Sequence, residues 1–196
     1  MGQGRAIAAL GLVLALAGCG PAAPPPPAAP PPGPKPVASI QELMKILIAP
    51  GADTVWKLPP SISEPDAKPK ATPEQAAADW AKVEAGALTL AEAANLVAQE
   101  GRVAAVAGTK LQDEGQEGNL ARDQIDARMK SARPDFLKHA LALQTAALKV
   151  RAAAAAKNPD ALLEAGGEID EACEACHKQF WYPAPEPAPG ANTTTK

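Results

Sequence analysis

The chain has very few aromatic residues. Of its 196 residues, three are Trp, two are Phe and one is Tyr, whereas hydrophobic residues as a whole make up 46%. Much of the hydrophobic content is therefore Ala, and the Ala-rich stretches predict helices because Ala has the highest helix propensity. A basic excess is also lacking, since 19 Lys and Arg face 22 Asp and Glu for a formal charge of −3. Nucleic-acid-binding proteins normally carry a basic patch, so we expect no nucleic-acid partner.

Common catalytic motifs are absent as well. The sequence has no HExxH, GxSxG or P-loop pattern, each of which supplies a defined chemistry to an enzyme family. We therefore do not expect an enzyme in the ordinary sense. The sequence also lacks the sustained alternation of polar and apolar residues that predicts strands. The expected fold class is all-α.

The N-terminal apolar run is too short to be an ordinary transmembrane anchor. It covers the 12 residues 6–17, whereas a spanning helix needs about 20. Arg5 precedes the run, and the last two residues of the run begin the letters LAGC at 16–19. This order is typical of an export signal. The ending resembles the bacterial lipobox, in which the cysteine, here Cys19, receives a diacylglyceryl group and becomes the new N-terminus. An ordinary signal peptide that contains a cysteine is the alternative.

The residue after this cysteine bears on localisation. Gly20 stands where an Asp would favour retention in the inner membrane, so the pattern resembles that of an outer-membrane lipoprotein. We expect a periplasm-facing protein held on the membrane by its lipid anchor. Two or more acyl chains would hold it firmly.

Proline is concentrated near the two ends of the chain. Residues 20–36 include ten Pro, which favours an extended polyproline II tether of roughly 50 Å at about 3.1 Å per residue. The expected organisation is a signal peptide at 1–18, a lipidated cysteine and Pro-rich tether at 19–36, a helical domain at 37–182 and a disordered Pro-rich tail at 183–196.

Four segments of the central domain have helical spacing. Four helices with short connections predict an antiparallel four-helix bundle. Capping boxes mark the first two starts, at Ser39 with Glu42 and at Thr72 with Gln75, and Pro50 is expected to kink or split the first segment. The expected segments are 39–58, 72–100, 134–157 and 159–180, with a loop at 108–120 and a short helix or irregular lead-in at 121–131.

The chemistry is concentrated at Cys173, Cys176 and His177. Their Cys-x-x-Cys-His pattern is the attachment signature of c-type haem. Two cysteines three residues apart on a helix point in neighbouring directions, so both thiols can form thioethers with vinyl groups on one porphyrin edge. The imidazole that follows is then directed toward the iron as its proximal ligand.

Three alternative interpretations of this motif compete with haem attachment. A redox-active dithiol is typical of an α/β fold, which the sequence does not predict. A zinc site would need a fourth ligand, and His139 is the only other His. A disulfide across one helical turn is geometrically awkward. Export favours haem, because c-type haem is attached outside the cytoplasm, and we expect one covalently attached haem c whose loss leaves the chain poorly folded.

A haem motif on the last of four helices resembles the cytochrome c′ family, the class II c-type cytochromes. The resemblance covers about residues 39–180 and rests on ACEACH at 172–177, on Phe180 and on the order of the helices. Softer matches to a periplasmic branch of relatives lie at 50–56, at 90–96 and at 166–167. One departure is Trp181, which stands where many members have Arg or Lys.

The resemblance implies that the distal ligand decides the function. Low-spin members place a Met on the first helix and carry electrons, whereas members with an apolar residue there bind NO or CO. Met44 lies in the matching region, and spacing alone leaves ligand and core filler equally open. The resemblance favours Met44 as a ligand over Met44 as a core filler. Met129, near the loop before the third long helix, and His139, on the flank of that helix, are weaker candidates because of their positions.

The expected function is therefore single-electron transfer by a membrane-tethered periplasmic mono-haem cytochrome with a His/Met-ligated iron. The alternative is a five-coordinate, cytochrome c′-like binder of NO or CO, and a third hypothesis is an assembly lipoprotein in which haem serves as core. Expected partners are periplasmic or membrane redox proteins. The resemblance also implies a homodimer as one oligomeric state, and we expect Trp56 to lie near the haem.

Overall fold

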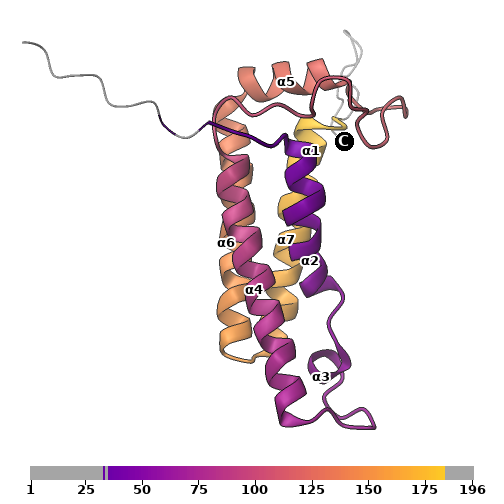
Figure 1. Cartoon of the computed structure of the whole chain (residues 1–196), viewed down its shortest axis with the longest axis vertical. Helices are drawn as coiled ribbons and strands as arrows, with labels where there is room; N and C mark the ends of the chain where they lie inside the picture. The colour runs from indigo at the N-terminus through magenta and orange to yellow at the C-terminus, as the bar shows by residue number, and fades with distance from the viewer. Residues whose placement is uncertain (1–32, 34, 184–196) are drawn as a thin grey trace, which may run out of the picture. The chain divides into compact units, whose positions relative to one another are not determined.

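The computed structural model describes residues 33 and 35–183. Cys19, the expected signal peptide and most of the tether and tail lie outside the described residues. Within the described part every regular element is a helix and no strand occurs, which confirms the all-α prediction. All of these helices belong to one compact unit that begins at Lys35 (Figure 1). None of the described helices combines the length and the apolar character that crossing a membrane requires.

The long predicted helices are present with ends shifted by a few residues. The short segment before the third long helix is also helical, and one short helix was not predicted. In chain order the elements are α1 (Ile40–Leu43), the π-helical turn η1 (Met44–Ile48), α2 (Ala49–Trp56), α3 (Pro60–Ser63), α4 (Pro73–Val97), α5 (Arg122–Ser131), α6 (Arg133–Ala155) and α7 (Pro159–Phe180).

Side chains cap the helix starts as the sequence predicts. At α1, the backbone N–H of Ser39 donates to Glu42 Oε2 at 2.8 Å, and the Ser39 hydroxyl accepts from the Glu42 N–H at 3.3 Å. Thr72 and Gln75 form the equivalent box at α4. Each box satisfies backbone donors that the first turn of a helix leaves without partners.

Pro50 does not split the first segment, so of the two expected outcomes the split is wrong. The helix continues from α1 through η1 into α2, with Met44 and Ala49 both in the right-handed helical region. Proline has no N–H to donate to the carbonyl four residues earlier. The wider π turn just before it accommodates this, because the Ala49 N–H bonds to Met44 O, five residues back.

The long helices pack side by side and alternate in direction (Figure 1). α4 packs on α6 and α6 packs on α7, while the α1–α2 segment packs on α4. Two pairs show that α4 and α6 run in opposite directions, namely Glu84 with Arg151 at 3.5 Å and Asn95 with Gln144 at 2.5 Å. α5 lies across one end of these helices.

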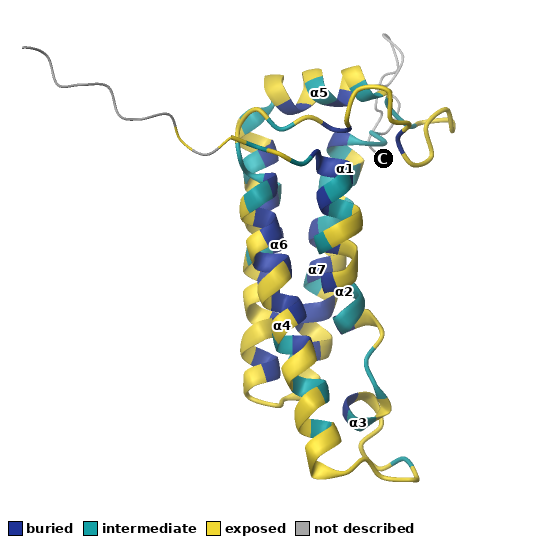
Figure 2. Ribbon diagram, in the orientation of Figure 1, coloured by how far each residue is buried: buried dark blue, intermediate teal, exposed yellow. Residues whose placement is uncertain are grey.

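The core is made mainly of small aliphatic side chains. The buried positions face inward along each long helix (Figure 2). Both Phe residues are buried, and Phe136 meets Phe180 edge to face at 5.2 Å between α6 and α7. Because Ala occupies so many inward positions, including Ala87 and Ala147, α4 and α6 can approach closely.

Candidate functional site

A cavity of about 460 Å³ lies between the first helical segment and the C-terminal end of α7. Three separate parts of the chain form its walls: the α1–α2 segment, the loop after α4, and the last turns of α7. Met44, Cys173 and His177 all line it. The structure thus brings together three of the four residues predicted to hold a haem within the described range.

The close approach of α2 to α7 sets one end of this cavity. A side chain at Gly166 would place its Cβ 3.0 Å from Val55 Cγ1, so Val55 would have to shift by a few tenths of an ångström to admit it. The cavity lies beyond that contact, toward the end of α7, where Trp56 and Trp181 both line it. Trp56, which we expect to lie near the haem, lines the same cavity as Met44 and His177.

The helical spacing of α7 directs Cys173 and His177 to the same face, because residues four apart are neighbours on a helix. The His177 ring lies 5.9 Å from the Tyr182 ring and 6.4 Å from the Trp181 ring, measured between centroids. Burial lowers the pKa of His177, while the Glu174 carboxylate acts in the opposite direction. The lowered pKa favours a neutral imidazole, the form that binds metals.

Both cysteines of the motif are free thiols in the structure. Burial, and next to it the charge of Asp170, raises the pKa of Cys173 to about 11. Burial and the neighbouring Cys173 raise the pKa of Cys176 to about 12. Cys176 does not line the cavity but packs, half-buried, against the core. The disulfide weighed as an alternative is therefore not formed here.

The opposite wall of the cavity is largely apolar. Met44 is the first residue of η1 and is half-buried, and Ile48 and Ala52 follow it along the wall. Met44 also packs against the core, which is what a core-filling role requires. A π turn is frequently found at functional sites, and this one begins at Met44 itself.

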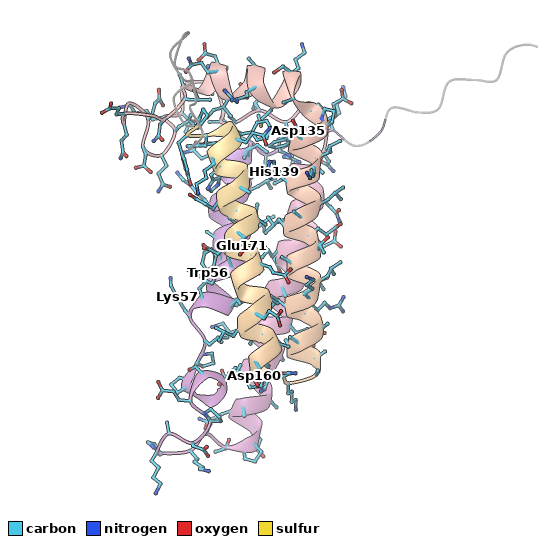
Figure 3. All side chains as sticks on the ribbon, turned by 180° about the vertical axis from the view of Figure 1, so that it is seen from behind. Trp56, Lys57, Asp135, His139, Asp160 and Glu171 are labelled. Atoms are coloured by element: carbon cyan, nitrogen blue, oxygen red, sulfur yellow. The ribbon has the colours of Figure 1, made fainter. Side chains whose placement is uncertain are left out.

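The two poorer ligand candidates lie elsewhere. Met129 is buried in α5 and does not line the cavity. The His139 Nε2 atom lies 2.6 Å from Gln179 Oε1, and the ring contacts Phe180 edge to face at 5.9 Å. Figure 3 shows His139 on α6, one turn from Asp135, which accepts a hydrogen bond from Gln179 at 3.3 Å.

The loop between α4 and α5 contributes the polar side of the cavity. Gln112, Asp113, Gln116 and Asn119 line it. Backbone turns with positive φ, including Asp113 at 60°, fold the loop back on itself. A hydrogen bond of 2.9 Å from the Leu120 N–H to Trp181 O ties the loop to the end of α7. The sequence predicts this loop, but its glycines and polar residues give no signal that it reaches α7.

Tyr182 closes the end of α7 over the histidine. Its hydroxyl donates to Glu174 Oε2 at 2.5 Å, and its N–H donates to His177 O at 3.0 Å. Partial burial, this hydrogen bond and nearby negative charges raise the pKa of Tyr182 to about 12. The hydrogen bonds from Tyr182 and then Lys178 lower the pKa of Glu174. The motif helix is therefore fixed at its last turn by side chain and backbone together.

Within the described part of the chain, no three or more His, Cys, Asp or Glu side chains gather as a metal site would require. Buried side-chain polar atoms in the same part all have hydrogen-bond partners. No family model, curated protein or solved structure matches the chain.

Proposed function

We propose that the chain is a membrane-tethered periplasmic mono-haem c-type cytochrome that carries single electrons, with its helices arranged as the antiparallel four-helix bundle of the cytochrome c′ family. One observation carries the proposal: Met44, Cys173 and His177, which lie far apart in the sequence, line the same cavity. The motif alone predicts thiols and an imidazole on one helix. The Met44 side chain, with its thioether sulfur, lines the same cavity but comes from the first helical segment. Its presence there is a consequence of the fold that the motif alone does not predict.

The residues around the cavity suit a haem. The volume of about 460 Å³ falls within the roughly 300–1,000 Å³ typical of ligand pockets. Ile48, Ala52 and Trp56 supply an apolar wall for a porphyrin face. Lys45 and the loop amides can bind its carboxylates, whereas Asp113 on the same side would repel them. This division matches a large apolar ring with acidic groups on one edge.

Each residue then has a distinct role. Cys173 and Cys176 would hold the porphyrin through thioethers, and His177 and Met44 would ligate its iron. The bound haem supplies reversible one-electron chemistry, and a Met ligand raises its potential. The chain orients the haem, and Trp181 limits the access of water to it. The proposed partners are periplasmic or membrane redox proteins. A homodimer is one oligomeric state proposed for the chain.

Covalent attachment is the first test. The full chain, exported from cells that attach c-type haem, should keep its haem through denaturing electrophoresis and acidic organic extraction. Cys173→Ala/Cys176→Ala should lose it, whereas the matched variant Cys19→Ser should keep it. A wild-type chain without haem, or with haem that extracts freely, would overturn the proposal.

The alternative function is supported by the packing of Met44. This side chain contacts the core, and if it acts only as filler the distal side of the iron is open to NO or CO. Rapid binding of CO to the ferrous wild-type protein supports this second candidate. Slow or absent binding that becomes rapid in Met44→Ala supports the electron carrier.

The membrane anchor rests on the sequence pattern at Cys19. The proposed lipoprotein should fractionate with membranes and incorporate labelled fatty acid. Cys19→Ser should abolish the labelling without changing the haem spectrum. Labelling that persists in Cys19→Ser would contradict the assigned attachment site.

A further inference from the structure

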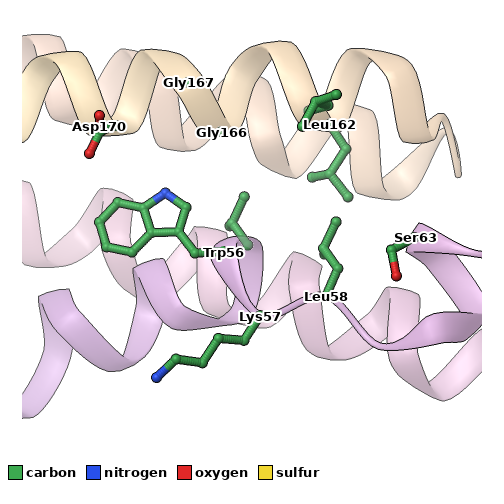
Figure 4. Close-up of a pocket in the computed structure, with 10 residues that line it drawn as sticks. Trp56, Lys57, Leu58, Ser63, Leu162, Gly166, Gly167 and Asp170 are labelled. Atoms are coloured by element: carbon green, nitrogen blue, oxygen red, sulfur yellow. The ribbon is translucent and has the colours of Figure 1, made fainter.

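A second cavity of about 570 Å³ lies along the same two helices, next to the first (Figure 4). It is a groove between α2 and α7, and its lining is mostly apolar, with Val55, Leu58 and Leu162 at its sides. Trp56 lines this groove and also lines the cavity that holds Met44, Cys173 and His177. The two spaces therefore share one lining side chain, that of Trp56.

The groove presents large apolar side chains to solvent. Trp56 is 49% exposed and Leu163 is 75% exposed. Figure 4 shows the indole of Trp56 facing α7 close to Gly167 and Asp170. A Cβ at Gly167 would meet no atom within 4 Å, so this side of the groove is open. Exposed apolar side chains gathered at a groove indicate an interaction site.

The unpaired charge at the groove is negative. Asp170 lines it and forms no ion pair among the described residues, and the same holds for Glu171 on the adjoining face of α7. Figure 3 shows Glu171 on α7 at nearly the same level as Trp56. Lys57 is the one cation lining this groove, but it pairs with Asp53 at 2.7 Å and points away from α7 in Figure 4.

We infer that this groove docks the redox partner of the chain, through a partner surface that places an apolar side chain between Lys or Arg residues. The apolar side chain would fill the space beside Trp56 and Leu163, and the cations would meet Asp170 and Glu171. A second copy of the chain fits poorly, because it carries a formal charge of −3 and the same acidic groove. Complementary charge sets encounter rate and orientation at such sites.

This location deepens the proposed function and, for its electron-transfer role, rests on it. A partner side chain that reaches Trp56 is one residue away from the cavity of Cys173 and His177. Docking there would bring the partner close to the haem without opening the cavity. The docking itself does not require the iron to change oxidation state, so the two claims can be tested separately.

The test uses a dye-labelled peptide, Lys-Lys-Leu-Leu-Lys-Lys, as the probe and the full chain, exported from cells that attach c-type haem, at low salt. Fluorescence anisotropy should show saturable binding, and a peptide with Ser in place of both Leu should bind more weakly. Asp170→Lys should weaken binding about tenfold, which corresponds to 1.4 kcal/mol. The matched variant Glu164→Lys, at another unpaired carboxylate of α7 outside the groove, should weaken it far less.

A variant that fills the groove gives an independent test. Gly167→Leu has open space for its side chain, so far-UV circular dichroism should be unchanged while peptide binding is lost. Equal weakening by Asp170→Lys and Glu164→Lys, or equal binding of the Ser peptide, would overturn the inference in favour of general charge attraction. Sedimentation showing self-association that Gly167→Leu abolishes would overturn it in favour of a second copy.

The outcomes also separate this inference from the proposed function. The optical spectrum of the same samples reports whether haem is present. Haem without groove-specific peptide binding overturns the docking site and leaves the cytochrome intact. Groove-specific binding without haem retains the docking site and overturns the cytochrome.

Discussion

Thr54 of α2 occupies the space that a side chain at Gly86 of α4 would need. A Cβ at Gly86 would lie 2.1 Å from Thr54 Oγ1, far inside a normal contact. The threonine is held in this position, because its hydroxyl donates to Gly51 O at 2.7 Å. The two helices therefore cross with no spare volume, and this crossing sets where the segment containing Met44 lies on α4.

The first prediction follows from this crossing. Gly86→Ala should lower the free energy of unfolding by about 1–2 kcal/mol, because the cost of overpacking exceeds the gain in helix propensity. Gly167→Ala is the matched control on α7: with no atom within 4 Å of its Cβ, it should raise the free energy by about 0.5–1 kcal/mol. Chemical denaturation of both variants checks this, and a stabilising Gly86→Ala would contradict the packing described.

The second prediction concerns the end of α7. Tyr182→Phe keeps the ring beside His177 but removes the hydroxyl that donates to Glu174. Loss of this hydrogen bond should lower the unfolding free energy. Glu174→Gln keeps an acceptor for the hydroxyl and should cost less. Equal stability of Tyr182→Phe and the wild type would show that the bond contributes nothing.

The third prediction concerns acid stability. The hydrogen bond from its own backbone N–H, followed by that from Thr72, lowers the pKa of Glu74 below its usual 4.5. A carboxylate whose pKa is lowered by folding stabilises the fold above its unfolded pKa, and this contribution disappears as the pH falls through the folded pKa. The unfolding free energy should therefore decrease as the pH drops below about 4.5, and Glu74→Gln should make that decrease shallower. If the unfolding free energy of Glu74→Gln depended on pH as that of the wild type does, this would count against a stabilising role of these hydrogen bonds.

The fourth prediction concerns the haem as part of the core. With few aromatic side chains in the chain and a cavity of about 460 Å³ beside α7, Cys173→Ala/Cys176→Ala should melt broadly and at a lower temperature than the wild type. Differential scanning calorimetry of the full chain measures both properties. Cooperative melting at the wild-type temperature would show that the helices need no bound group.

Local signals predicted the helices well. The capping boxes at Ser39 and Thr72 are present because a hydroxyl and a carboxyl or amide three residues apart satisfy the same backbone donors in any context. The inward positions of α4, α6 and α7 follow from helical spacing of apolar residues. The π turn before Pro50 was not predicted, because the missing N–H of a proline indicates a kink or a break and does not specify the local geometry that accommodates it.

The candidate site was predictable only in part. The residues of the Cys-x-x-Cys-His motif are close in sequence, so their shared helix follows from local rules. The loop residues Gln112 and Asn119 reach the cavity through a backbone bond between Leu120 and Trp181, a tertiary contact without a local signal. The groove beside Trp56 likewise depends on how closely α2 approaches Gly166.

The optical spectrum of the full chain, exported from cells that attach c-type haem and recorded oxidised and reduced, with and without CO, is the most direct test of the central claim that Cys173, Cys176, His177 and Met44 hold a redox-active haem. The account predicts a low-spin spectrum with a weak far-red Met–iron band, unaffected by Met129→Leu and lost in Met44→Ala. A high-spin spectrum that changes at once with CO would contradict Met44 as ligand and favour gas binding. A chain without a haem spectrum would contradict the account as a whole.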